Sequence, residues 1–198
     1  KDKGRCGMNN LLGIFIKSML IDNVVFIQYL AICPFIGMTA ETDKATGMGI
    51  ATTFVIVLAT AVTYPLYYGI MVPLKLQYLQ TLMFILVIAA LVQLVEFYLK
   101  KSIPGLYSAM GVYLALITTN CAVLAVTITC INKNYNYIES LVYALGAALG
   151  FLIALVIMSG VRERIKSAPL PLFIKGKPIL FITAGLLSLS FLGFKGLI

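Results

Sequence analysis

A long uncharged run near the middle of the chain limits the folds that this sequence can adopt. Residues 106–131 contain 26 positions without a formal charge, and about 20 apolar residues are enough for a helix to cross the hydrocarbon core of a bilayer. Thr118, Thr119 and Asn120 lie at the centre of this run, directly before Cys121. Polar groups are costly to bury in hydrocarbon without hydrogen bonds. We therefore expect a membrane segment that is interrupted at its centre, beside a cysteine.

The composition indicates that the whole chain is an integral membrane protein. Apolar residues make up 61% of the 198 residues and charged residues only 11%, whereas soluble domains carry roughly 25% charged residues. The sequence has no histidine and its acidic residues are scattered singly, which excludes a Ser-His-Asp triad and a zinc site built on imidazole. The net charge of +8 does not indicate nucleic-acid binding, because the basic residues cluster in short loops between apolar runs.

Six apolar segments follow one another along the chain, and we expect each to lie in the membrane. They cover residues 11–37, 47–71, 78–98, 106–131, 138–161 and 178–194. Small residues such as Gly146 and Gly150 in the fifth segment predict a close helix contact. The polar residues 1–7 precede Met8 and are interpreted as a leader or a non-native extension, in which Cys6 is incidental.

The first segment is also interrupted beside a cysteine. Lys17, Asp22 and Asn23 interrupt it, and the 15 residues at 24–38 are too few for a full span at a rise of 1.5 Å per residue. Pro34 directly follows Cys33, so the backbone there lacks a donor and disfavours helical geometry at the cysteine. A broken or partial helix is therefore expected at Cys33.

The two interrupted segments occupy corresponding positions in the two halves of the chain. Three segments lie in residues 8–103 and three in residues 104–198, so the second half enters the membrane from the opposite side to the first. Interrupted helices at matching positions of an inverted repeat indicate a site near the midplane. The expected fold is an all-α integral membrane protein with six transmembrane helices in two inverted three-helix repeats. Helices 1 and 4 would be broken near the midplane, bringing Cys33 and Cys121 together.

The loops predict an orientation for these segments. The loops after the first, third and fifth segments carry eight Lys and Arg residues, and the opposite side carries four when counted from Met8. By the positive-inside rule, both termini are expected outside the cytoplasm. Counting the three basic residues of 1–7 removes most of this bias.

Two cysteines at the membrane centre allow three interpretations. A free cysteine is most often a small buried hydrophobe, which is also our interpretation of Cys130. Alternatively, Cys33 and Cys121 form a disulfide between the two broken helices. The third possibility is half of an iron–sulfur site, because a two-iron cluster takes four thiolates and a second chain would supply the other two. Donors at residues 118–120 suit such an anionic group, although the same residues also suit a hydrogen-bonded helix contact.

Several longer motifs then make the family recognisable. They read ICPFIG, GMGIATTFV, VIAALVQLVEFYLKK, LITTNCAVLA, SGVRER and ITAGLLSLSFLGF. Together they resemble the family of small paired membrane subunits that Rnf complexes, the ion-translocating ferredoxin:NAD oxidoreductases, share with the sodium-pumping NADH:quinone oxidoreductase. Proline after Cys33 and the short connection between the second and third segments favour the A-type subunit of Rnf (RnfA) within that family. The resemblance extends from Met8 to the C-terminus, departing slightly at Ala31 and Ala125, where the family often has glycine.

The resemblance implies a cofactor and partners. Subunits of this family pair with a homologous subunit of opposite topology, here the E-type subunit (RnfE). One cysteine from each half of each subunit holds a [2Fe-2S] cluster inside the membrane. By motif, the metal and cofactor ligands of this chain are Cys33 and Cys121, whereas Cys6 and Cys130 match no ligand. The other partners implied are the B, C, D and G subunits of Rnf, and the location is the bacterial cytoplasmic (inner) membrane.

We therefore expect an electron-carrying subunit of a redox-driven pump that couples ferredoxin:NAD electron transfer to Na⁺ or H⁺ translocation, with no catalytic site in this chain alone. The alternative is a secondary transporter of a small solute, or a structural scaffold, without a metal. Carboxylates in membrane segments are functional candidates, which makes Asp22, Glu96 and Glu139 candidates for an ion path. All three lie toward segment ends, and they are not counted among the site residues.

Overall fold

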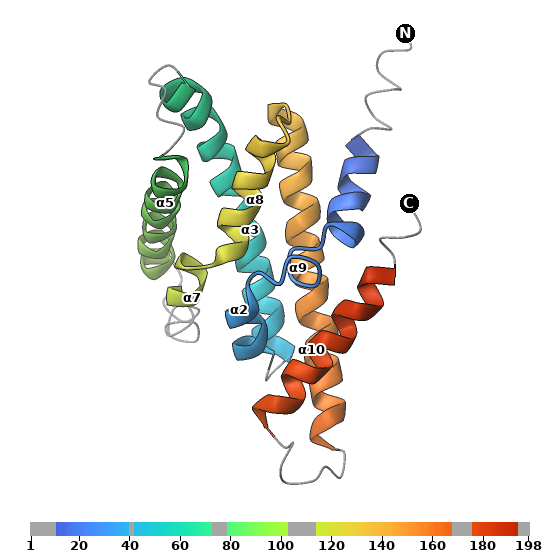
Figure 1. Cartoon of the computed structure of the whole chain (residues 1–198). Helices are drawn as coiled ribbons and strands as arrows, with labels where there is room; N and C mark the ends of the chain where they lie inside the picture. Colours follow the sequence, from blue (N-terminus) through green and yellow to red (C-terminus); the bar gives the residue numbers. More distant parts are fainter. Residues whose placement is uncertain (1–10, 40–41, 73–78, 103–113, 168–175, 194–198) are drawn as a thin grey trace.

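The computed structural model describes residues 11–39, 42–72, 79–102, 114–167 and 176–193, and these residues form helices and turns without any β-strand (Figure 1). Three helices are long and apolar enough to cross a membrane, namely Ala45–Met71, Gln80–Phe97 and Tyr137–Ile165. Shorter apolar helical stretches cover Leu11–Leu20, Leu116–Asn132 and Pro178–Leu192, of which the second is interrupted at residues 119 and 120. The predicted leader with Cys6 and the first part of the predicted segment 106–131 lie outside the described residues.

The helices follow the apolar segments closely. An N-terminal helical stretch from Leu11 leads into a π-helical turn, η1 (Lys17–Ile21). In chain order there follow α2 (Ile32–Met38), α3 (Thr42–Leu66), the π-helical turn η2 (Tyr67–Met71), α5 (Gln80–Ser102), α7 (Leu114–Thr118), α8 (Cys121–Asn132), α9 (Tyr137–Lys166) and α10 (Lys177–Leu192). Pro65 lies inside α3 near its end, and η2 begins two residues after that proline.

Helices α3 and α9 form the centre of the molecule, and the other elements pack around them. The two run side by side in Figure 1, with α8 beside both and α5 further out. Met48 and Ile56 of α3 and Leu155 of α9 are fully buried. At Gly49 the two backbones come close, because a Cβ atom there would lie 3.5 Å from Cα of Leu152. This pair is the scaffold on which the shorter helices are held.

The N-terminal helical stretch packs against α9 at two glycines. A Cβ atom at Gly146 would lie 2.8 Å from the carbonyl oxygen of Phe15, and one at Gly150 would lie 2.7 Å from that of Met19. Only glycine permits backbones to approach this closely, as small residues do at many helix interfaces in membranes. The close contact that the sequence predicted in the fifth segment is thus confirmed.

Both segments that the sequence predicted to be interrupted are broken. The chain leaves helical geometry between η1 and α2, and again between α7 and α8. By contrast, α5 is continuous and presents a row of exposed apolar side chains, among them Leu82, Leu86 and Phe97. The structure is therefore a helical membrane protein with two interior breaks, whereas the six membrane crossings and the inverted repeat stay predictions.

A candidate cofactor site where two broken helices meet

The first break places Cys33 at the start of a short helix. Residues 22–31 connect η1 to α2 without regular structure beyond a turn, and Tyr29 and Ala31 have positive φ angles of 53° and 61°. An L-residue in the left-handed region is strained, so the surrounding contacts must hold this connection in place. Cys33 is the second residue of α2, and its side chain is exposed. The prediction that Pro34 disfavours helical geometry at this cysteine is therefore wrong, because Pro34 lies in the first turn of α2, where a helix tolerates proline.

The second break places Cys121 at the start of α8. Asn120 is the N-cap of that helix, and its Oδ1 accepts a hydrogen bond of 3.0 Å from the backbone N–H of Ala122. Asparagine is among the best N-cap residues because its side chain satisfies a free donor of the first turn. The polar residues in the middle of the uncharged run thus lie where α7 ends and α8 begins. Cys121, which is half-buried, is the first residue of α8.

One hydrogen bond joins the two breaks. The backbone N–H of Ala31 donates to Sγ of Cys121 over 2.9 Å, although the two residues are 90 positions apart in the chain. Helix α2 also packs against α7, so the two broken segments are neighbours over more than this one contact. Because Ala31 lies two residues before Cys33, the two predicted ligands lie on adjoining backbone segments. We call this place, where residues 31–33 meet residues 120 and 121, the junction.

Buried polar side chains hold the first break against the scaffold. Asn23 is 2% exposed, and its Nδ2 donates to the carbonyl oxygen of Gly150 on α9 over 3.1 Å. Ser188 of α10 donates to the carbonyl oxygen of Phe26 and lies 2.8 Å from the hydroxyl of Tyr29. Helix α10 therefore provides a donor for the irregular backbone at Phe26, and the backbone of α9 accepts a hydrogen bond from the side chain of Asn23.

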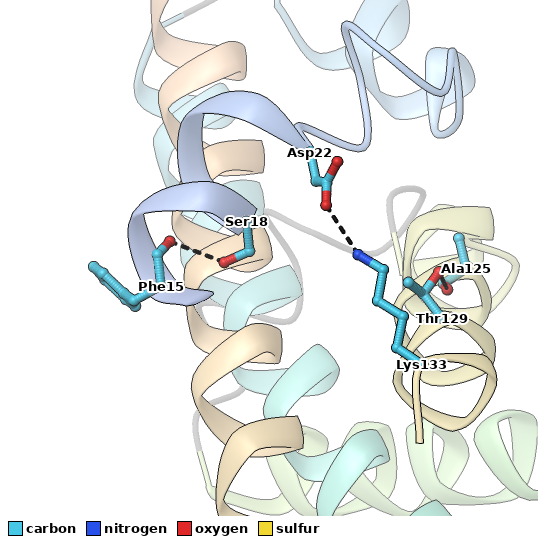
Figure 2. A network of polar contacts seen from close by, with 6 residues as sticks. All are labelled: Phe15, Ser18, Asp22, Ala125, Thr129 and Lys133. Atoms are coloured by element: carbon cyan, nitrogen blue, oxygen red, sulfur yellow. Dashed lines mark hydrogen bonds and ion pairs between the residues drawn. The ribbon is translucent and has the colours of Figure 1, made fainter. Parts of the chain in front are cut away.

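An ion pair lies at the other end of α8. Figure 2 shows Nζ of Lys133 beside Oδ2 of Asp22, at 2.9 Å. The same ammonium group lies 5.0 Å from the ring centre of Tyr143, within cation–π range. Asp22 was a candidate for an ion path, and here it links the start of the first break to the end of α8.

The other ion-path candidates lie elsewhere in the described structure. Glu139 accepts a hydrogen bond of 3.0 Å from the backbone N–H of Asn136 and completes a capping box at the start of α9, which is a structural role. Glu96 is half-buried on α5. Neither of these two carboxylates belongs to the segments that form the junction.

The groups at the junction fit half of a two-iron cluster. Two thiols are available there, and the side-chain Nδ2 of Asn120 is buried with no hydrogen-bond partner. The described residues contain no group of three or more His, Cys, Asp or Glu side chains that could hold a metal ion. A cluster held by Cys33 and Cys121 thus needs further ligands from outside these residues.

Cys130 lies apart from the junction. It is 1% exposed on α8, and its Sγ lies 3.8 Å from the carbonyl oxygen of Ser140 on α9, which fits the structural role that the sequence suggested. The sequence did not indicate the roles of Asn23 and Ser188. Asn23 was only one polar residue in an interrupted segment. A local sequence pattern does not predict a hydrogen-bond partner that lies more than a hundred residues away.

The fold and the junction together describe a multi-pass helical membrane protein in which two helix breaks meet beside Cys33 and Cys121. Residues 11–198 match the family model described as "Rnf-Nqr subunit, membrane protein". The chain therefore belongs to the Rnf-Nqr family of membrane subunits.

Relatives of similar length are closely similar to this chain. The A subunit of the Na⁺-translocating ferredoxin:NAD⁺ oxidoreductase complex of Acetobacterium woodii is 51% identical over 187 residues, which cover 94% of this chain and 97% of the relative. The A subunit of the ion-translocating oxidoreductase complex of Syntrophotalea carbinolica is 49% identical over 96% of this chain and 99% of the relative. The protein of the same description from Aeromonas hydrophila is 47% identical with the same coverage.

Proposed function

We propose that this chain is the A-type component of an ion-translocating oxidoreductase complex of the Rnf type, in which it carries electrons through the membrane. In this proposal Cys33 and Cys121 supply half of the ligands of a [2Fe-2S] cluster, and a homologous E-type subunit supplies the other half. The complex would transfer electrons from ferredoxin to NAD and couple this transfer to the movement of Na⁺ or H⁺.

The observation that carries the proposal is the hydrogen bond from the Ala31 N–H to Sγ of Cys121. It ties the second cysteine to the backbone beside the first, at the point where both helices are broken. The names of the relatives support the same conclusion, since each is described as the A component of an ion-translocating oxidoreductase complex.

The residues at the junction suit an anionic group. A bound cluster supplies one-electron transfer at this position. The Ala31 N–H already points at the Cys121 sulfur, and a donor to a thiolate stabilises its negative charge. The N-terminus of α8, where Cys121 is the first residue, favours negative charge as well. Cys33 is exposed on α2, which leaves its sulfur accessible to a ligand set shared with a partner chain.

The wider arrangement follows from the same proposal. The chain would cross the membrane six times, with residues 8–103 and 104–198 as inverted three-helix repeats, and the broken helices would lie near the midplane. The basic loops support an orientation with both termini outside the cytoplasm. The location would be the bacterial cytoplasmic membrane, where the partners include the B, C, D and G subunits of Rnf.

Iron content and low-temperature EPR of the purified complex test the proposal. We compare the wild type with Cys33→Ser and Cys121→Ser, and use Cys130→Ser as the matched control because Cys130 is buried away from the junction. We expect both ligand variants to lose the same [2Fe-2S] signal and its iron, while the control keeps them and all complexes stay assembled. Unchanged iron and an unchanged spectrum in the two ligand variants would favour a metal-free transporter or scaffold instead.

A further inference from the structure

The motif SGVRER at the end of α9 has a structural role that the proposed function does not use. Its arginine, Arg162, donates from Nη1 to the carbonyl oxygen of Ile36 over 2.9 Å and to Oγ1 of Thr39 over 3.2 Å. Ile36 lies in the last turn of α2, and Thr39 is the C-cap of that helix and fully buried. Arg162 thus binds the C-terminal end of the helix that carries Cys33.

A helix as short as α2 needs such a partner. It has seven residues, far fewer than an isolated helix requires for stability, and its last carbonyl groups lack intrahelical donors. A guanidinium group satisfies these acceptors and interacts favourably with the negative end of the helix dipole. Lysine and arginine near helix C-termini act in this way, but here the arginine comes from a different helix, 126 positions along the chain.

A second contact from the same motif reinforces the first. Ser159 is 2% exposed, and its Oγ lies 3.1 Å from Oγ1 of Thr42, the first residue of α3. The motif therefore contacts both sides of the connection between α2 and α3. Since α9 is one of the two central helices, these contacts fix α2 to the scaffold of the molecule.

We propose that Arg162 is a positioning residue for Cys33. By holding the C-terminal end of α2 on α9, it fixes the direction of that helix and hence the place of the Cys33 sulfur relative to Cys121. This inference rests on the proposed function, because the geometry that Arg162 fixes matters for electron transfer only if the two cysteines share a cluster.

The test compares variants of two arginines on the same helix in the purified complex. Arg162→Gln removes the positively charged guanidinium group, and Arg162→Lys keeps a positive charge at the same position. Arg164→Gln is the matched control because Arg164 is exposed. The readouts are iron per complex, the g-values and line widths of the cluster EPR signal, and its reduction potential by redox titration. None of these is expected to change if Arg162 only adds stability at the end of α9.

We expect Arg162→Gln to broaden the signal, lower the iron content and shift the potential, Arg162→Lys to restore part of each, and Arg164→Gln to match the wild type. If the Arg162→Gln complex does not assemble, Thr39→Val is used for the test instead. Valine has a shape similar to that of threonine but lacks the hydroxyl group that accepts a hydrogen bond from Arg162. A wild-type signal that depends on both cysteines but is unchanged in the Arg162 or Thr39 variant would overturn the inference alone. Absence of any signal that depends on Cys33 and Cys121 in the wild type would overturn the proposed function itself.

Discussion

Replacing Gly150 by alanine tests the contact that fixes the first broken segment to α9. An alanine Cβ would lie 2.7 Å from the carbonyl oxygen of Met19 and 3.2 Å from Nδ2 of Asn23. The first of these is a backbone atom, so the N-terminal helix itself must move. Overpacking of this kind costs about 1–3 kcal/mol, and the better helix propensity of alanine offsets up to about 1 kcal/mol of that. We expect Gly150→Ala to lose roughly 1–2 kcal/mol of stability.

Gly160→Ala is the matched control, because a Cβ atom at Gly160 meets nothing within 4 Å on the same helix. The assay measures the melting temperature of the detergent-solubilised complex. The readout is the fraction of this subunit that remains soluble after heating. A loss of about 1–2 kcal/mol corresponds to a fall of about 2–8 °C for a chain of this size, whereas the control should melt at or slightly above the wild type. A Gly150→Ala protein as stable as the Gly160→Ala protein would refute the close approach at Gly150.

Three further substitutions test separate parts of the site. Ala31→Gly relieves a left-handed φ of 61°, so we expect a gain of about 1 kcal/mol in a melting experiment, and a loss would contradict that backbone geometry. Ser188→Ala leaves the Phe26 carbonyl oxygen without its donor and should cost roughly 1–3 kcal/mol by the same assay; no change would mean that this bond does not hold the break. Asp22→Asn breaks a partly exposed ion pair with Lys133 and should cost less than about 1 kcal/mol. It should also leave ion-dependent turnover unchanged, and a turnover that collapses would return Asp22 to the ion path.

The sequence predicted where the membrane helices break because the local chemistry is explicit. Asn120 is a strong N-cap in the middle of an uncharged run, and α8 begins directly after it. Pro34 indicated a break in the first segment, but the break lies at residues 22–31, and Pro34 itself is in the first turn of α2. The small residues at the centre of the fifth segment likewise predicted the close contact with another helix, since few other features require two glycines four residues apart. These features act over a few residues, and the sequence displays them directly.

The contacts that hold the breaks in place were not predictable in this way. Asn23 reaches Gly150, and Arg162 reaches Ile36, across more than a hundred residues. Nothing in the sequence near Arg162 distinguishes it from Arg164, two residues later in the same basic stretch. Ala31 has no feature that indicates a positive φ. Long-range partners of this kind depend on how the helices pack, which periodicity does not encode.

Iron-edge anomalous diffraction from crystals of the assembled complex is the most direct test of the claim that the two helix breaks form half of a cluster site. The proposal predicts a strong iron peak within bonding distance of the sulfurs of Cys33 and Cys121, with the remaining iron–sulfur ligands from one neighbouring chain. An iron-free junction, with both sulfurs in contact only with protein atoms, would contradict it.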